Sequence, residues 1–224
     1  MGSKNKLKRF KENETFHNVF QPTREELVNE TYKLKGKWRS GVFKNENPLV
    51  LELGCGKGEY TVGLAKRYPN KNFIGIDIKG ARFWRGAKTA IEEDIDNAGF
   101  IRTQIELVDY IFEENEVDEI WITFPDPQIK YKRTKHRMTN LQFLERYKKV
   151  LKPNGLMHLK TDSEFMHGYT LGLLHGGGHE VLYANHNVYK LEGSPEEVTE
   201  IQTFYESQYL EKDKAITYIR FQIN

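Results

Sequence analysis

Residues 48–68 read PLVLELGCGKGEYTVGLAKRY, and this stretch decides the fold of the chain. It begins as a short apolar run and then breaks at closely spaced glycines. Beyond the glycines, apolar residues recur with helical spacing at Tyr60, Leu64 and Tyr68. The pattern predicts a strand, a glycine-rich turn and a helix.

The turn has the spacing Glu52-x-Gly54-x-Gly56-x-Gly58. The third glycine comes one residue too early for the G-x-G-x-x-G of dinucleotide-binding turns, and the spacing of a phosphate-binding P-loop also fails. Glycines allow a tight turn and a close ligand approach. The carboxylate of Glu52 would repel a pyrophosphate but would suit a ligand with an amino group and a sulfonium. Asp77 ends the next apolar strand, where an acid can accept both ribose hydroxyls. Together these residues favour S-adenosylmethionine over NAD.

The rest of the chain continues the alternation of strands and helices, which predicts an α/β fold with a mostly parallel sheet and helices on both faces. We expect one domain over residues 21–224, preceded by a loose basic arm over residues 1–20. Further strands are expected within 72–78, 99–105, 119–124, 155–162, 179–189 and 215–223, and helices within 81–95, 140–155 and 165–174.

Ligands of such sheets bind beyond the carboxyl ends of the strands. Besides the glycine turn, the residues expected there are Asp77, Gln104, Asp126 and Asp162. Each is an acid or an amide, so this edge of the sheet is the candidate site.

Residues 123–137 read TFPDPQIKYKRTKHR, which places Asp126 between two prolines ahead of a basic run. Proline fixes its own φ and restricts the residue before it, so the acid is held in few conformations. The basic residues are Lys130, Lys132, Arg133, Lys135 and Arg137. By itself such a run is more often a solvated face. After an acid at a strand end, it favours binding of phosphates, with the acid at the reacting centre.

Composition excludes several classes of protein. The chain has 224 residues, a single cysteine and a net charge of +2. One cysteine cannot form an internal disulfide and fits a reducing cytoplasm. The sequence contains no run of 18 apolar residues, so no membrane span is predicted. The histidines and the cysteine lack the spacing of metal ligands, so no metal is expected.

Charge is segregated although the total is near neutral. One basic cluster lies in residues 4–11 and another in residues 130–137, whereas acids gather in stretches such as IEEDID and SPEEVTE. A basic face on a nearly neutral chain is the usual footprint of nucleic-acid binding. The sequence leaves open whether the protein is a monomer or a homodimer.

The motifs ELGCGKG, IGIDI, FPDPQIKYKRTKHR, HLKTD and TFYE, in this order, resemble the bacterial tRNA (guanine-N7-)-methyltransferase family. The resemblance covers residues from about 50 to 210 and implies a class I, Rossmann-like methyltransferase fold. It also implies methyl transfer from S-adenosylmethionine to N7 of guanine 46 in the tRNA variable loop. The cofactor positions it implies are Glu52, Asp77, Gln104 and Asp126, the last also being catalytic, and the glycine turn adds Gly54 and Gly56. The tRNA positions it implies are Lys130, Asp162, Thr203 and Glu206, and the basic run adds Lys132 and Arg133.

The chain departs from the family pattern after Asp126, because Gln128-Ile129 stands where Trp-Pro is usual and Gln104 where Asp is common. Two alternatives stay open for the late motifs: Asp162 could be a helix N-cap, and Thr203 with Glu206 could be a capping box. Three other functions compete with the implied one. They are a methyltransferase for proteins or small molecules, an inactive RNA-binding module and a nicotinamide enzyme.

Overall fold

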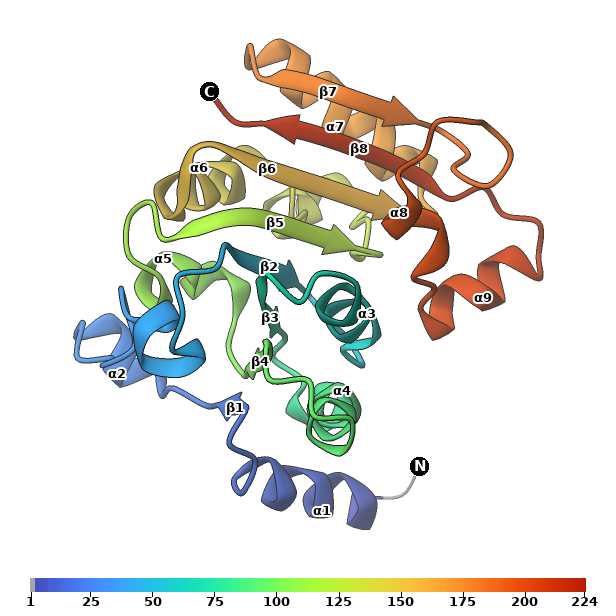
Figure 1. Ribbon diagram of the computed structural model, residues 1–224. Helices are drawn as coiled ribbons and strands as arrows, with labels where there is room; N and C mark the ends of the chain where they lie inside the picture. The colour runs from blue at the N-terminus through green and yellow to red at the C-terminus, as the bar shows by residue number, and fades with distance from the viewer. Residues whose placement is uncertain (1–2) are drawn as a thin grey trace.

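The computed structural model describes residues 3–224 and shows one central sheet with helices on both sides (Figure 1). The order of the eight strands in the sheet is β1-β4-β3-β2-β5-β6-β8-β7. Their bounds are β1 Val19–Phe20, β2 Leu49–Leu53, β3 Asn72–Ile76, β4 Ala98–Ile101, β5 Val117–Thr123, β6 Leu151–Thr161, β7 Glu180–Asn185 and β8 Thr217–Gln222.

The first six strands in that order pair in parallel, whereas β8 runs antiparallel to both β6 and β7. The centre of the sheet is β2, in which every residue is buried. A strand covered on both faces reads as a continuous apolar run, which explains the sequence LVLEL apart from its one acid. The mostly parallel α/β fold expected from the sequence is therefore confirmed.

Helices cover both faces of this sheet (Figure 1). One face carries α3, α4 and α8, with α1 packed on α4; the other carries α2, α5, α6 and α7. The helices are α1 Ser3–Asn13, α2 Arg24–Val28, α3 Glu59–Arg67, α4 Gly80–Glu92, α5 Val108–Ile111, α6 Leu141–Val150, α7 Glu164–Gly176, α8 Glu196–Glu200 and α9 Phe204–Leu210. Shorter segments are η1 Trp38–Phe43, a π-helix, and the 3₁₀-helices η2 Ile105–Leu107 and η3 Tyr131–His136.

The amino-terminal segment differs from the loose arm that the sequence suggested, although residues 1–2 lie outside the described part. Helix α1 packs against α4, where the buried Asn13 donates from Nδ2 to the carbonyl of Gly80 at 2.9 Å. The two residues of β1 then pair with Phe100 and Ile101 of β4. The physical reason is that these contacts bury Asn13 and extend the sheet, neither of which the polar local sequence reveals.

Candidate functional site at the carboxyl edge of the sheet

The glycine turn joins β2 to α3 and lies over the end of β3. Gly54 and Gly56 have φ of +75° and +56°, a left-handed conformation that residues with a Cβ adopt only at a cost. The amides of Gly54 and Cys55 both donate to the carbonyl of Ile76, at 2.8 and 3.1 Å. The turn is thus fixed to the neighbouring strand, with its backbone facing the carboxyl edge.

Glu52 is buried beneath this turn, with only 3% of its surface exposed. Its carboxylate accepts from the amide of Thr61 at 2.8 Å and from the hydroxyls of Thr61 and Thr123, the latter at 2.6 Å. Burial raises the pKa of Glu52 to about 7, against the opposing effect of these hydrogen bonds. The carboxylate therefore ties β2 to α3 and β5.

Asp77 follows β3 and completes the turn from the other side. Its Oδ2 accepts from the amide of Gly56 at 3.1 Å, and its Oδ1 accepts from the amide of Lys79 at 2.7 Å. The side chain is half-buried, so its carboxylate still borders the open edge of the sheet. Asp77 and the glycine turn, which the sequence placed together, are in direct contact.

Gln104 follows β4, the neighbour of the strand β3 that Asp77 follows. It precedes η2 and lines an open cleft of about 480 Å³ together with Ile78, Thr103 and Leu107. Its Oε1 accepts from Arg24 at 3.2 Å. The lining combines apolar side chains with amides, hydroxyls and the cations Arg24 and Arg102, so it offers both packing and hydrogen-bonding partners to a planar ring.

Asp126 lies in the connection that follows β5, and its side chain is exposed. A hydrogen bond to the nearby backbone fixes its carboxylate. Its Oδ1 accepts from the amide of Gln128 at 3.1 Å. Phe124 and Gln128, two residues to either side, have φ of +48° and +46°, a strained conformation for residues other than glycine. Such strain persists only where the surroundings hold it, and it concentrates at functional sites.

The middle of the basic run forms η3, with Lys130 and Arg137 as the flanking cap residues, and most of the run is exposed. Lys130, Lys132 and Arg133 have exposed side chains on the solvent side of the segment. The expectation that Arg137 binds phosphate is wrong, because only 6% of this residue is exposed. Its guanidinium donates to the carbonyls of Gln128 and Ile129, each at 3.2 Å, and stacks over the ring of Tyr169. Arg137 thus clamps the Asp126 loop and is not available to a phosphate.

The late motifs lie beyond the ends of β5 and β6, and the structure shows how each is used. Asp162 follows β6, and its Oδ2 accepts from Lys214 Nζ at 2.9 Å, while Ser163 caps α7 in its place. Thr203 and Glu206 form the capping box of α9, which confirms that alternative. Glu206 has no exposed surface, so its carboxylate cannot contact an RNA directly in this arrangement.

Two residues of this region were not identified from sequence. Lys57, inside the glycine turn, places its ammonium 3.5 Å from the ring centroid of Phe204 at the start of α9. Lys160, in β6, pairs with Glu206 at 2.6 Å, and both side chains are fully buried. A lysine within an apolar strand was the available signal for Lys160, because such a residue needs a buried partner.

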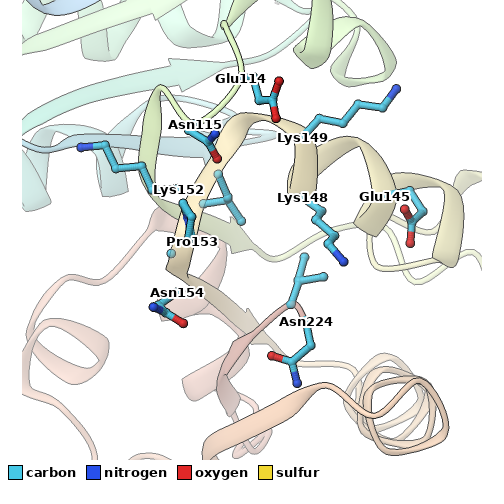
Figure 2. A pocket seen from close by; sticks show the side chains of 12 residues that line it. Glu114, Asn115, Glu145, Lys148, Lys149, Lys152, Pro153, Asn154 and Asn224 are labelled. Carbon is cyan, nitrogen blue, oxygen red and sulfur yellow. The ribbon is translucent and has the colours of Figure 1, made fainter.

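Another cavity lies at the opposite edge of the sheet. It measures about 560 Å³ and is lined by the end of α6, the start of β6 and the carboxyl-terminal residues (Figure 2). Its lining mixes the acids Glu114 and Glu145 with Lys148, Lys149 and Lys152. The acids that follow the carboxyl ends of the strands do not line this cavity.

Within residues 3–224, no helix combines the length and apolar character needed to cross a membrane.

Comparison with known proteins places this geometry in a family. A methyltransferase family described as "Putative methyltransferase" matches residues 46–219. A protein of Christiangramia forsetii named tRNA (guanine-N(7)-)-methyltransferase is 75% identical over the full length of both chains. The chain belongs to the tRNA (guanine-N7-)-methyltransferase family. Family proteins of the same name from Bacteroides fragilis and Porphyromonas gingivalis are 46% and 50% identical, covering 97% and 93% of this chain and 85% of theirs.

Solved structures share the fold of this family member at low identity. One titled as an antibiotic-related methyltransferase aligns with a TM-score of 0.62 at 16% identity, covering 93% of this chain and 98% of the other. The 16S rRNA methyltransferase KamB gives 0.60 at 13% identity, covering 80% and 88%. A SAM-dependent methyltransferase from Aquifex aeolicus gives 0.55 at 17%, covering 88% and 98%. The class I methyltransferase fold is therefore confirmed.

Proposed function

We propose that this family member transfers a methyl group from S-adenosylmethionine to N7 of guanine 46 in the variable loop of tRNA. The observation that carries the proposal is the meeting of three features at one edge of the sheet. The glycine turn with Asp77, the strained loop of Asp126 and the exposed basic segment η3 follow three strands of that edge. Family membership and the relatives' names support the substrate.

The cofactor proposed here fits the residues of this chain. The half-buried carboxylate of Asp77 is suited to accept from ribose hydroxyls, and the cleft beside Gln104 suits a purine. Gly54 and Gly56 leave their backbone uncovered by Cβ atoms, which permits close approach. Glu52 supports the turn from below and is a positioning residue in this proposal.

The chemistry requires orientation more than proton transfer. Guanine N7 carries a free lone pair, so no proton has to leave before it attacks. S-adenosylmethionine supplies an electrophilic methyl carbon; the new bond joins this carbon to N7, and the broken bond leaves its electron pair on sulfur. Asp126 would hold the base in line or favour the positive charge that develops on the ring. Lys130, Lys132 and Arg133 would bind phosphates, and Asp162 and Thr203 would border the base.

The direct test is transfer from labelled S-adenosylmethionine to unmodified tRNA, followed by identification of the nucleoside and its position. We expect 7-methylguanosine at position 46, and loss of the product when that guanine is replaced. Ribosomal RNA, bulk protein and small metabolites serve as control substrates. Label in protein or metabolites but not in tRNA would overturn the proposal. Failure of S-adenosylmethionine to bind in calorimetry would favour an inactive RNA-binding module.

A further inference from the structure

Helix α1 and the start of α4 enclose a second basic site. Their cleft measures about 460 Å³ and is bordered by five cationic side chains: Lys6 and Arg9 from α1, Lys79 and Arg82 at the start of α4, and Arg102 after β4. No acidic residue of the described chain lines it. The cleft exists only because α1 folds back onto α4, so the basic amino-terminal cluster and the α4 cations form one surface.

The five cations lack acidic partners, unlike their neighbours on the same helices. Within the described residues, none of the five lies within 4.0 Å of a carboxylate, whereas Lys8 pairs with Glu12 and Arg85 with Glu92. Like charges around one cleft repel each other. A bound anion would relieve that cost.

Aromatic contacts hold part of the cleft in place. The guanidinium of Arg102 lies 4.6 Å from the ring centroid of Phe10, and that of Arg9 lies 4.6 Å from the ring of Trp84. Trp84 in turn donates from Nε1 to Glu12 at 2.6 Å, which anchors α1 to α4. Stacked guanidinium groups lose less freedom on binding phosphate than free ones do.

The position of the cleft relates it to the candidate site. Ile78 and Arg102 line both this cleft and the cleft of Gln104, so the two are adjacent. The sheet order β4-β3-β2-β5 places this cleft and η3 on opposite sides of the glycine turn. Three strand spacings separate β4 from β5, roughly 15 Å. An RNA backbone that contacted both the α1–α4 cleft and η3 would cross the face of the proposed reacting centre.

We propose that the α1–α4 cleft binds phosphate groups of the tRNA backbone, as a second contact independent of η3. This inference rests on the proposed function, because it takes tRNA as the substrate. The cleft would recognise the phosphate backbone and not a base. Its lining offers five cationic donors, and Asn5 is the one amide side chain among its lining residues that could read a base edge.

Matched pairs of substitutions test the cleft. The double variant Lys6→Ala/Arg82→Ala removes one lysine from α1 and one arginine from α4, both of which line the cleft. The control Lys8→Ala/Arg85→Ala removes the same residue types from the same helices, where each is paired to an acid. We expect the cleft variant to bind tRNA more weakly and to lower the slope of log K against log[salt] by about 1.5. The control should change the slope by less than about 0.5.

Lysine acetylation of the wild-type protein gives a readout that needs no variant. Bound tRNA should protect Lys6 more than Lys8, and the same concentration of inorganic phosphate should protect neither. Equal salt slopes for the two double variants, or equal protection of both lysines by tRNA, would overturn the inference. Protection by inorganic phosphate alone would likewise overturn it in favour of a small-anion site. Methylation of tRNA at N7 by the wild-type protein in the same preparation would show that the proposed function stands even if the cleft inference fails.

Discussion

Nζ of Lys160 lies 2.6 Å from Oε1 of Glu206, and neither side chain has any exposed surface. The ammonium also donates to the carbonyl of Ile201 at 3.1 Å and faces the ring of Tyr60. Glu206 further accepts from the hydroxyl of Tyr189 at 2.8 Å. Burial lowers the pKa of Lys160 to about 8, although Glu206 acts against that shift. The pair fastens α9, and with it Thr203, to the end of β6.

Removing one member of this pair should destabilise the protein. Glu206→Gln at pH 7 leaves the buried Lys160 amine without its counter-charge, so the amine either stays charged and unpaired or gives up its proton; breaking such a buried pair costs about 3–5 kcal/mol in comparable cases. Urea unfolding measures the loss. Glu211→Gln, at the exposed end of the same helix, should change stability by less than about 0.5 kcal/mol. Equal stability of the two variants would mean that the pair does not hold α9.

Glu52 should impose a pH dependence on stability. Its pKa is raised from 4.5 to about 7 in the folded protein, so between these values the folded state binds more protons than the unfolded state. Stability from this group is present below pH 4.5 and is lost as pH rises through 7, by about 3 kcal/mol. Glu52→Gln removes the titration, so the difference between wild type and variant should grow from pH 4.5 to pH 7.5. A constant difference across that range in urea unfolding would contradict the assignment.

Asp77 should contribute to cofactor affinity. Asp77→Ala removes an acceptor for ribose hydroxyls, and hydrogen bonds to a charged group are worth about 1.5–3 kcal/mol. Asp77→Asn should lose less, because one oxygen remains to accept from the amide of Gly56 or Lys79. Calorimetric titration with S-adenosylmethionine measures both. Unchanged affinity in Asp77→Ala would place the cofactor elsewhere along the edge.

Asp126 should affect turnover far more than tRNA affinity. Asp126→Asn and Asp126→Ala remove a carboxylate that the strained loop fixes by a backbone contact, at the proposed reacting centre. Single-turnover methylation and filter binding of tRNA separate the two effects, with at least a tenfold loss of kcat expected. Asp96→Asn, an exposed acid at the other end of the strands, is the control. A variant with near wild-type kcat would remove Asp126 from the mechanism.

The exposed basic segment η3 should set part of the salt dependence. Lys132→Ala/Arg133→Ala should make the slope of log K against log[salt] shallower by about 1.5, if each side chain neutralises one phosphate. Arg146→Ala/Lys149→Ala is the matched control, because both of these α6 cations pair with Asp109. A full salt slope in the η3 variant would show that segment to be only a solvated face.

Lys130, the N-cap of η3, should differ from the cations within η3, because it lies nearest to Asp126 in the chain. Lys130→Ala is therefore expected to lower turnover at saturating tRNA as well as affinity.

The local parts of the site could be predicted from sequence for a physical reason. Apolar periodicity distinguishes strand from helix, and a left-handed turn requires glycine, so residues 48–68 define β2, the turn and α3 by themselves. The parallel order then brings the ends of β2 and β3 together. The contact between Gly56 and Asp77 follows from that arrangement.

Only the tertiary structure decided which charges face solvent. Arg137 reads as one more cation in a basic run, yet it turns inward because its loop leaves two carbonyls and two aromatic rings for it to cover. Glu206 meets Lys160 from another element, and Asn13 meets Gly80 across 67 residues of chain. Contacts of this kind depend on how distant segments pack, and the identity of neighbouring residues in the sequence carries no record of them.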